Sequence, residues 1–361
     1  MLEKIFLRNF KCHVEQGFDL APLTVLSGVN GIGKSSLIQA LLALRQTWDA
    51  VIYGRDFIIN GHLVNLGQPK DVLSENAQDD TLSITFTQDS HETCCHVTLE
   101  SGALFLTDDV LRGCKFPFAD GFVYLCAERT GPRALFPVST PAQRTANRCG
   151  NMGQFAAHEL EQRSLQGVSC EGLILSRQNG EPLSRDLLTQ TEAWLARVCR
   201  PVRVHTLGHP SMDLVNLEFS FADDGFGRRF RASNVGFGLT YVLPIFVAVL
   251  SAKPGDFIII ENPEAHLHPK GQAVIGEFLS YAAAAGIQIL VESHSDHLLN
   301  GVRVAVKRGK LAPEKTKVHF FTFDDYGRTT VIAPRIDENG RFDVWPDDFF
   351  DEWDKQLAEL F

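Results

Sequence analysis

Eight residues near the start of the chain have the types and spacing that bind a phosphate chain. They are Gly28-Val29-Asn30-Gly31-Ile32-Gly33-Lys34-Ser35. Glycines let backbone N–H groups turn toward phosphate oxygens. In this pattern the lysine reaches the β- and γ-phosphates and the serine hydroxyl binds Mg²⁺. The stretch therefore predicts a nucleotide-binding loop.

The flanking residues predict the elements that position this loop. Residues 23–27 are apolar and predict a buried strand, and residues 36–44 predict a helix packed on a sheet. The N-terminus of a helix adds the positive end of its dipole to an anion site. A chance glycine-rich turn is the alternative, but spacing and context both argue against it. The predicted nucleotide-binding residues are Asn30, Gly31, Gly33, Lys34, Ser35 and Ser36, and Ser35 is also the predicted Mg²⁺ ligand.

A second group of polar side chains follows two apolar runs in the last third of the chain. Residues 257–260 are Phe-Ile-Ile-Ile and lead into Glu261, while residues 287–291 lead into a Glu-Ser-His segment. Such continuous apolar runs predict buried parallel strands. Open α/β sheets bind ligands at the carboxyl ends of their strands. Carboxylates and a histidine are therefore expected at a ligand site.

Two further polar features each allow two interpretations. Gln68 lies in a Gly-, Asn- and Asp-rich region, 51–82, where loops and short strands are expected. It is a candidate lid over the metal, or else a solvated loop side chain. Arg129 and Arg133 follow a predicted strand, 122–127, at a Gly-Pro turn. They either contact phosphate or a partner subunit, or form surface salt bridges.

The remaining patterns predict the rest of the architecture. Alternating residues predict antiparallel strands in an early part of the chain, a hairpin is expected after residue 315, and an acidic amphipathic helix is expected at 347–360. No sustained heptads predict a coiled coil. The expected strands are 4–11, 81–87, 96–100, 103–107, 317–323 and 329–333, and the region 150–200 is expected to be mainly helical, including 154–161 and 185–198.

Composition narrows the class of protein. The chain has 361 residues, of which 44% are hydrophobic and 22% charged, as in ordinary globular proteins. Its formal charge of −10 disfavours a surface covered with nucleic-acid contacts, although a local basic groove is compatible with it. Eight scattered cysteines without a CxxC pair suit a reducing, cytoplasmic environment. No signal peptide or membrane-spanning segment is expected.

With these residues in place, the chain resembles the soluble ABC-type ATPases of the AAA class. This group includes RecF, the chromosome-maintenance (SMC) heads and the OLD-type and Septu-type defence ATPases. The resemblance rests on the phosphate loop, the glycine-rich turn 234–240 and two later motifs. These are Glu-Asn-Pro-Glu-Ala-His-Leu-His-Pro from Glu261 and Glu-Ser-His-Ser around His294. A Trp-Pro-Asp-Asp-Phe-Phe-Asp-Glu block at 345–352 is similar to a domain of unknown function that ends a bacterial subgroup.

The resemblance implies roles for the later residues. Glu261 takes the Walker B position and holds Mg²⁺, with Ser35 and Gln68 as the other metal-site residues. His294 takes the switch position near the γ-phosphate or the attacking water. The turn 234–240 takes the signature position, which completes the site of a second subunit; a plain helix-capping loop is the alternative. Its implied contact residues are Asn234, Gly236, Phe237, Gly238 and Thr240.

The residue after the Walker B acid departs from the family pattern. The catalytic carboxylate usually stands there, but this chain has Asn262. An amide can orient a water molecule but cannot take its proton. Either Glu264 takes over that role, or hydrolysis is slow. Phosphoryl transfer depends mostly on positioning and charge, so turnover is still expected. The implied catalytic set is Glu261, Asn262, Glu264 and His294.

The implied fold is an α/β ABC-type ATPase head. It has a mixed central sheet with the phosphate loop flanked by helices, an antiparallel β lobe and a helical lobe. The expected ranges are 1–135, the phosphate loop and β portion; 136–230, a helical insert; 231–310, the signature, Walker B and switch portion; and 311–361, a hairpin and acidic helix. The histidines His266, His268, His294 and His297 suggest a transition-metal site as an alternative, but their spacing disfavours it.

The implied function is that of an ATPase with ATP and Mg²⁺ as cofactors. It acts as a homodimer or higher homo-oligomer that senses or clamps DNA or RNA and regulates a separately encoded effector, a nuclease, in anti-phage defence. No appended nuclease domain is expected after His294. A RecF-like role in DNA repair or replication is the alternative, and a transporter's ATPase subunit is disfavoured. No membrane partner is expected.

Overall fold

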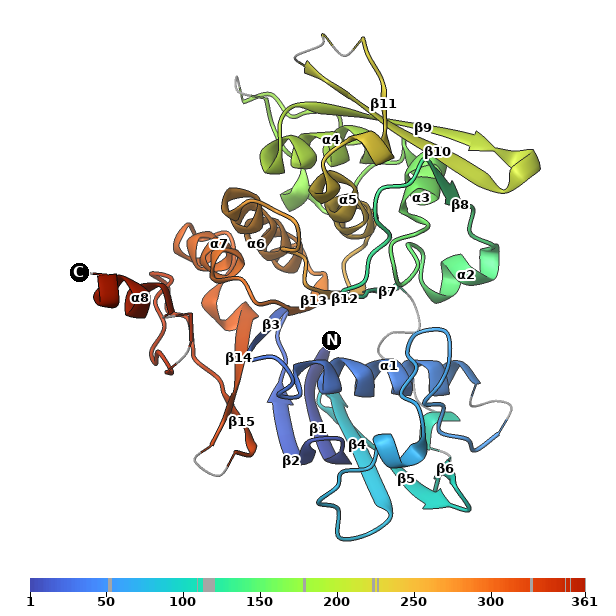
Figure 1. The fold of residues 1–361 in the computed structure, drawn as a ribbon, viewed down its shortest axis with the longest axis vertical. Coiled ribbons are helices and arrows are strands. Elements are labelled where there is room, and N and C mark those ends of the chain that lie inside the picture. Colours follow the sequence, from blue (N-terminus) through green and yellow to red (C-terminus); the bar gives the residue numbers. More distant parts are fainter. Residues whose placement is uncertain are drawn as a thin grey trace. The chain divides into compact units, whose positions relative to one another are not determined.

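A computed structural model describes residues 1–50, 54–108, 110–112, 121–177, 180–222, 225, 227–324, 327–347, 349–350 and 352–360. The chain forms two compact units (Figure 1). The first comprises residues 1–119, 316–335 and 342–361, and the second comprises 120–315 and 336–341. Each unit is described by itself below. The division of the sequence into four ranges stays a prediction.

The first unit contains a five-stranded antiparallel sheet. Its strand order is β2-β1-β4-β5-β6. Apolar side chains alternate with polar ones along β1, so Ile5 and Leu7 are buried while neighbours face solvent. The predicted strands are confirmed, and β2 is an addition. The bounds are β1 Leu2–Phe10, β2 His13–Asp19, β4 Thr81–Gln88, β5 His91–Glu100 and β6 Ala103–Leu106.

The phosphate loop belongs to a second sheet of the same unit. Strand β3 (Leu23–Gly28) pairs in parallel with β14 (Thr316–Phe323), and β14 pairs antiparallel with β15 (Thr329–Ile332). This confirms the predicted hairpin, although two residues of its turn, 325 and 326, lie outside the described residues. Helix α1 (Lys34–Ala50) begins two residues earlier than expected, directly at the lysine of the loop.

The C-terminal helix is shorter than the sequence suggests. Helix α8 spans Glu352–Leu360, whereas a start at residue 347 was expected. Phe350 has a left-handed φ of 57°, which interrupts a helix. Phe349 is fully buried and its ring lies 4.9 Å from Phe320 and 5.0 Å from Trp345. Packing of this aromatic cluster therefore takes precedence over helix formation before residue 352.

The second unit carries three parallel strands and two helices that follow them. Strand β12 (Phe257–Glu261) lies between β7 (Phe122–Leu125) and β13 (Gln288–Glu292). Helix α6 (Pro269–Ala284) connects β12 to β13, and α7 (Asp296–Lys307) follows β13. The two apolar runs are thus buried parallel strands, as predicted. Their carboxyl ends place Glu261 directly opposite Glu292.

The expected helical insert also contains a sheet. Strands β9 (Val202–His209) and β10 (Leu214–Phe221) pair antiparallel, with β8 (Leu135–Pro137) and β11 (Phe230–Arg231) at β10. Trp194 of α4 packs against Phe246 and Phe278 in the core. The helices are α2 Pro141–Ala146, α3 Ala156–Arg163, α4 Leu187–Val198 and α5 Phe237–Leu250. Within the described residues, no helix has the length and apolarity needed to cross a membrane.

Together these elements give a mixed α/β fold with antiparallel and mixed sheets, as predicted.

Candidate functional site

The phosphate loop of the first unit depends on glycine at its first position. Gly28 has φ 133°, and a Cβ there would lie 2.1 Å from the carbonyl oxygen of Phe321. A side chain at position 28 would clash with Phe321, so β14 can lie this close to the loop only because residue 28 is a glycine. Gly31 also has a positive φ, 76°, but nothing lies near its Cβ position. At Gly28 and Gly31, no side chain of the residue itself therefore shields the backbone N–H groups of the loop.

Lys34 lies inside the loop and is almost completely buried. Its side chain has 3% exposure, and its Nζ donates to the carbonyl oxygens of Gly28, at 2.9 Å, and Val29, at 2.6 Å. A buried ammonium is stabilised only when such acceptors surround it. The side chain therefore places a positive charge at the centre of the loop. Ser35 and the buried Ser36 follow at the start of α1.

Two neighbouring segments form hydrogen bonds to the backbone of the loop. His13 Nε2 donates to the carbonyl oxygen of Gly33 at 3.1 Å, and the Thr329 hydroxyl donates to that of Ile32 at 3.1 Å. Burial lowers the pKa of His13, so its ring is neutral at physiological pH. Cys12 Sγ would lie 2.3 Å from a Cβ at Gly33. These contacts adjoin a cleft of about 920 Å³, whose lining includes Lys11, Cys12, His13, Lys70, Arg328 and Thr329.

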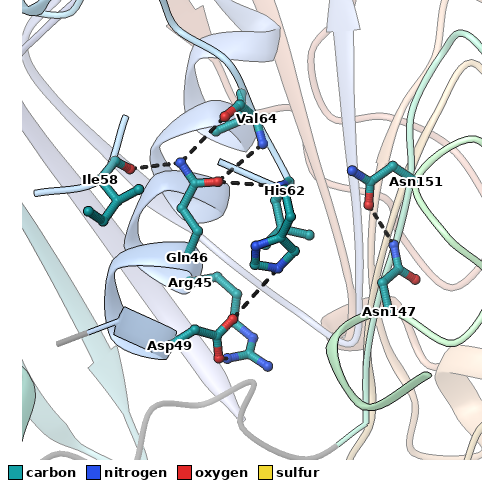
Figure 2. A network of polar contacts seen from close by, with 9 residues as sticks. Arg45, Gln46, Asp49, Ile58, His62, Val64, Asn147 and Asn151 are labelled. Atoms are coloured by element: carbon teal, nitrogen blue, oxygen red, sulfur yellow. Dashed lines mark hydrogen bonds and ion pairs between the residues drawn. The ribbon is translucent and has the colours of Figure 1, made fainter. Parts of the chain in front are cut away.

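Gln68 lies in the same unit, in a loop held by α1. Figure 2 shows the Gln46 side chain reaching from α1 to the segment at Ile58 and Val64, and its Nε2 donates to the Ile58 carbonyl oxygen at 2.7 Å. Further along, Asn60 accepts from the N–H groups of Leu66 and Gly67 at 2.9 and 3.0 Å. Gln68 itself is exposed, and its backbone N–H donates to Asp71 at 2.7 Å. Its role at the metal stays a prediction.

Glu261 ends β12 in the second unit with both carboxylate oxygens hydrogen-bonded. The Tyr124 hydroxyl donates to Oε1 at 3.0 Å, and the Ala127 N–H donates to Oε2 at 3.0 Å. Burial raises the pKa of this carboxyl group, and the two hydrogen bonds oppose that rise. Each oxygen of a carboxylate keeps a further lone pair. The side chain is therefore fixed in one orientation with acceptor capacity left for a cation.

Glu264 is the more unusual carboxylate of this turn. It has 9% exposure, and Oε1 accepts the backbone N–H of His294 at 2.7 Å. Oε2 is buried and has no hydrogen-bond partner among the described residues. Burial raises the pKa of Glu264, so its affinity for a proton exceeds that of an ordinary glutamate. This is the property required of a general base. His294 itself is exposed.

The turn between Glu261 and α6 has two left-handed residues. Asn262 has φ 45° and His266 has φ 62°. Asparagine tolerates this conformation better than most residues, which gives Asn262 a backbone role besides any contact of its amide. Its N–H donates to the Glu292 carbonyl oxygen at 2.8 Å, which ties the turn to β13. The structure thereby brings together Glu261, Asn262, Glu264 and His294.

Arg129 also contacts this turn, which neither interpretation of the sequence anticipated. It has 4% exposure and binds the carbonyl oxygens of Glu261 and Asn262, both at 2.6 Å. It is therefore not a surface salt bridge. Apart from Cys126, the carbonyl groups that it binds come from distant positions, so no local sequence signal could reveal these contacts. Arg133, in contrast, is exposed.

The signature turn is partly exposed and packs on the same region. Helix α5 (Phe237–Leu250) begins inside the range 234–240 that was expected to be a turn, so the turn proper ends at the N-cap of the helix, Gly236. Phe237 is 45% exposed, and its ring lies 4.5 Å from that of His266. Thr240 is buried and its hydroxyl donates to the Phe237 carbonyl oxygen at 3.0 Å. A cleft of about 370 Å³ lies beside the turn; its lining includes Arg200, Phe230, Asn234, Gly236, Gly238 and His268.

Two histidines of the turn after Glu261 have structural contacts. Among the residues that the structure describes, no three His, Cys, Asp or Glu side chains converge on one point. His266 is stacked between Phe237 and Tyr241, and His268 Nδ1 caps α6 by accepting the Lys270 N–H at 3.3 Å. The roles of Ser35 and Glu261 as Mg²⁺ ligands stay predictions; each offers an oxygen donor of the kind that Mg²⁺ prefers.

Parts of the chain are similar to known protein families. Residues 4–100 match an AAA domain family. Residues 163–300 match a family described as "AAA domain, putative AbiEii toxin, Type IV TA system". Residues 311–360 match a protein family of unknown function, and this range includes the Trp345–Glu352 block. An "OLD nuclease" of Thermus scotoductus (strain ATCC 700910 / SA-01) is 24% identical, over 95% of this chain and 69% of that protein.

Two solved structures show the same fold. The Smc head bound to the C-winged helix domain of ScpA is 12% identical and has a TM-score of 0.54, covering 93% of this chain and 98% of its own. The Smc head with an extended coiled coil, bound to the C-terminal domain of ScpA derived from Pyrococcus furiosus, is 13% identical, with a TM-score of 0.53 and 99% coverage of both chains. Two parts of the chain thus match AAA domain families, its fold is that of the SMC heads, and its sequence is similar to that of an OLD nuclease.

Proposed function

We propose that the chain binds ATP with Mg²⁺ through its phosphate loop and hydrolyses it with Glu264 as the general base. The observation that carries this proposal is the pair of charges described above. Lys34 presents a buried cation at the centre of a glycine loop, and Glu264 presents a buried carboxylate oxygen without a partner. The first suits a phosphate chain, and the second suits a water molecule that must lose a proton.

The other residues have positioning roles in this proposal. Ser35 and Glu261 hold Mg²⁺, which supplies charge neutralisation at the phosphates when bound. Gln68 approaches the metal from its loop. Glu264 takes the proton from the attacking water as the bond to the leaving phosphate oxygen breaks. Asn262 and His294 orient the water and the γ-phosphate.

We propose that two copies of the chain act together. Asn234, Gly236, Phe237 and Gly238 would contact the nucleotide of the second copy, supported by the exposure of Phe237 and the helix N-terminus that follows. Thr240 has an internal role because its hydroxyl bonds to Phe237. The assembly is a homodimer or a higher homo-oligomer.

The biological role that we propose is control of a separately encoded effector, a nuclease, in anti-phage defence, in response to DNA or RNA. The relationship to an OLD nuclease and the match to a family described as a toxin-system AAA domain support it. The alternative is a RecF-like ATPase in DNA repair or replication.

Nucleotide binding and turnover test the chemical part. A fluorescent ATP analogue and a phosphate-release assay are applied to the wild type and to Lys34→Ala. The variant loses the charge at the loop centre, so binding should weaken by at least about tenfold and turnover should disappear. Unchanged affinity in Lys34→Ala would contradict the assignment of the loop.

Molar mass and co-purification test the biological part. Light scattering with and without ATP should show a shift to a dimer or larger assembly. The product of a neighbouring gene should co-purify in one nucleotide state. A monomer in both states rules out the two-copy site. An adjacent replication gene in place of a nuclease or toxin gene favours the repair alternative.

A further inference from the structure

The end of β12 and the start of α5 share one buried cation. Arg129 lies in the loop after β7, and its guanidinium has almost no contact with solvent. Among the described residues, no carboxylate forms an ion pair with it, and its acceptors are backbone carbonyl oxygens. Burial of an arginine without a direct ion pair is costly. Such an arrangement persists only where the surrounding backbone requires it.

The acceptors come from three different segments of the second unit. Nη1 donates to the carbonyl oxygens of Glu261, at 2.6 Å, and Cys126, at 3.1 Å. Nη2 donates to that of Asn262 at 2.6 Å, and Nε donates to that of Tyr241 at 3.2 Å. The planar fork of arginine presents donors in fixed directions, and lysine has no equivalent. One side chain therefore fixes the ends of β7 and β12 against α5.

The contact with Glu261 and Asn262 has a specific geometric basis. In an extended strand, successive carbonyl groups point to opposite sides. The left-handed φ of Asn262, 45°, breaks this alternation, and one guanidinium then binds both carbonyl oxygens. Arg129 thus binds the backbone at the point where the chain turns from Glu261 toward Glu264.

A second contact extends the link to the signature turn. The guanidinium lies 4.3 Å from the centre of the Tyr241 ring, and the Tyr241 hydroxyl donates to the carbonyl oxygen of Ala127. The Tyr241 ring in turn lies 5.8 Å from Phe237 and 4.9 Å from His266. These contacts form a continuous path from Phe237 through Tyr241 and Arg129 to the backbone that bears the carboxylates.

We propose that Arg129, together with Tyr241, is a positioning device that couples the signature turn to the catalytic turn. It does not touch the nucleotide; it sets the orientation of the Glu261–Glu264 backbone according to the state of the signature turn. This inference rests on the proposed ATP hydrolysis and says how that hydrolysis is regulated. When a second copy of the chain contacts Phe237, the change reaches the catalytic turn through Arg129 and raises the rate of turnover.

The primary variant is Arg129→Lys, which keeps the charge and removes the fork. Because nucleotide affinity resides in the phosphate loop, we expect the Kd for ATP to stay within about threefold of wild type. Displacement of the catalytic turn should lower kcat by about tenfold or more. The matched control is Arg177→Lys in the same unit, where the arginine is exposed and kcat should be unchanged. An unchanged kcat in Arg129→Lys overturns the proposal.

Coupling is tested separately from stability. Tyr241→Phe keeps the ring and removes only the hydroxyl, which donates to the Ala127 carbonyl oxygen and accepts the Arg129 N–H at 3.4 Å, so it should fold even if Arg129→Lys does not. Phe237→Ala should lower kcat in the wild-type background and have little additional effect with Arg129→Lys or Tyr241→Phe. Such non-additivity marks residues that act as a unit. Additive losses in both backgrounds would show that no coupling exists.

The outcomes distinguish this inference from the proposed function. If the wild-type protein hydrolyses no ATP under any condition, the proposed function fails. The other case is that the wild type hydrolyses ATP, and that Arg129→Lys loses thermal stability and kcat in the same proportion as a variant of the buried core such as Leu195→Ala. Arg129 is then a structural residue only, and this inference fails while the proposed function stands.

Discussion

The backbone N–H of His294 donates to Oε1 of Glu264 at 2.7 Å, so the segment after β13 holds the carboxylate by its backbone while the imidazole stays exposed. The hydrogen bond joins a residue after β13 to one after β12. It leaves Oε2 as the buried acceptor without a partner in the described part of the chain. A water molecule that donates to Oε2 would be oriented by this fixed carboxylate.

Replacement of Glu264 by glutamine should separate binding from turnover. The amide keeps the size of the side chain but cannot accept a proton, so kcat should fall by about 10²- to 10⁴-fold. The Kd for ATP should change little, because Lys34 and the loop glycines remain. Single-turnover phosphate release checks this.

The matched control is Glu314→Gln, which makes the same change at an exposed glutamate. It should leave kcat at the wild-type value. Wild-type hydrolysis in Glu264→Gln would show that another group, or no base at all, deprotonates the water.

Glu264→Gln should also be more stable than the wild type at neutral pH. Burial raises the folded-state pKa of Glu264 above its unfolded value. The protonated form of Glu264 stabilises the folded protein. This stabilisation is fully present below the pKa that Glu264 has in the unfolded chain, and it is lost as pH rises through the pKa that Glu264 has in the folded protein. Glutamine resembles the protonated acid at every pH. Thermal midpoints should therefore favour Glu264→Gln at pH 7 to 8 and converge with wild type near pH 4.

Glu314→Gln again serves as the control, since an exposed carboxylate has no comparable burial. Parallel melting curves of wild type and Glu264→Gln across the whole pH range would contradict the burial of this charge.

The phosphate-loop glycines should differ sharply in their tolerance of alanine. Gly28→Ala places a Cβ against the backbone of Phe321, so β14 must move. Gly31→Ala adds only the left-handed strain of a non-glycine residue, about 1–2 kcal/mol. Urea unfolding should show a clearly larger loss for Gly28→Ala than for Gly31→Ala. Equal losses would contradict the close approach of β14 to the loop.

The sequence was sufficient to predict the parts of the site whose signals are local. The glycine loop, the strand before it and the helix after it are recognisable within about twenty residues, because glycine spacing and apolar runs are properties of neighbouring positions. The same holds for Glu261 at the end of β12. These elements are where they were expected.

The parts that were missed depend on distant contacts. Arg129 finds its acceptors more than a hundred residues away, at Tyr241 and Glu261. The early start of α5 buries Thr240, which had been expected at a subunit contact. Strand β10 did carry a signal, since Val215, Leu217 and Phe219 alternate with polar neighbours. The insert at 136–230, expected to be helical, therefore contains a strand here.

The last prediction separates two roles of Asn262. Its φ of 45° is a backbone requirement, whereas its amide is the proposed orienting group for water. Asn262→Gly satisfies the backbone and removes the amide, so stability should be retained while kcat falls by about tenfold. Asn262→Ala removes the amide and adds left-handed strain of about 1–2 kcal/mol, so both stability and kcat should fall. Urea unfolding and single-turnover hydrolysis measure the two effects independently. Wild-type turnover in Asn262→Gly would show that the amide has no part in the reaction and that asparagine is there for the turn alone.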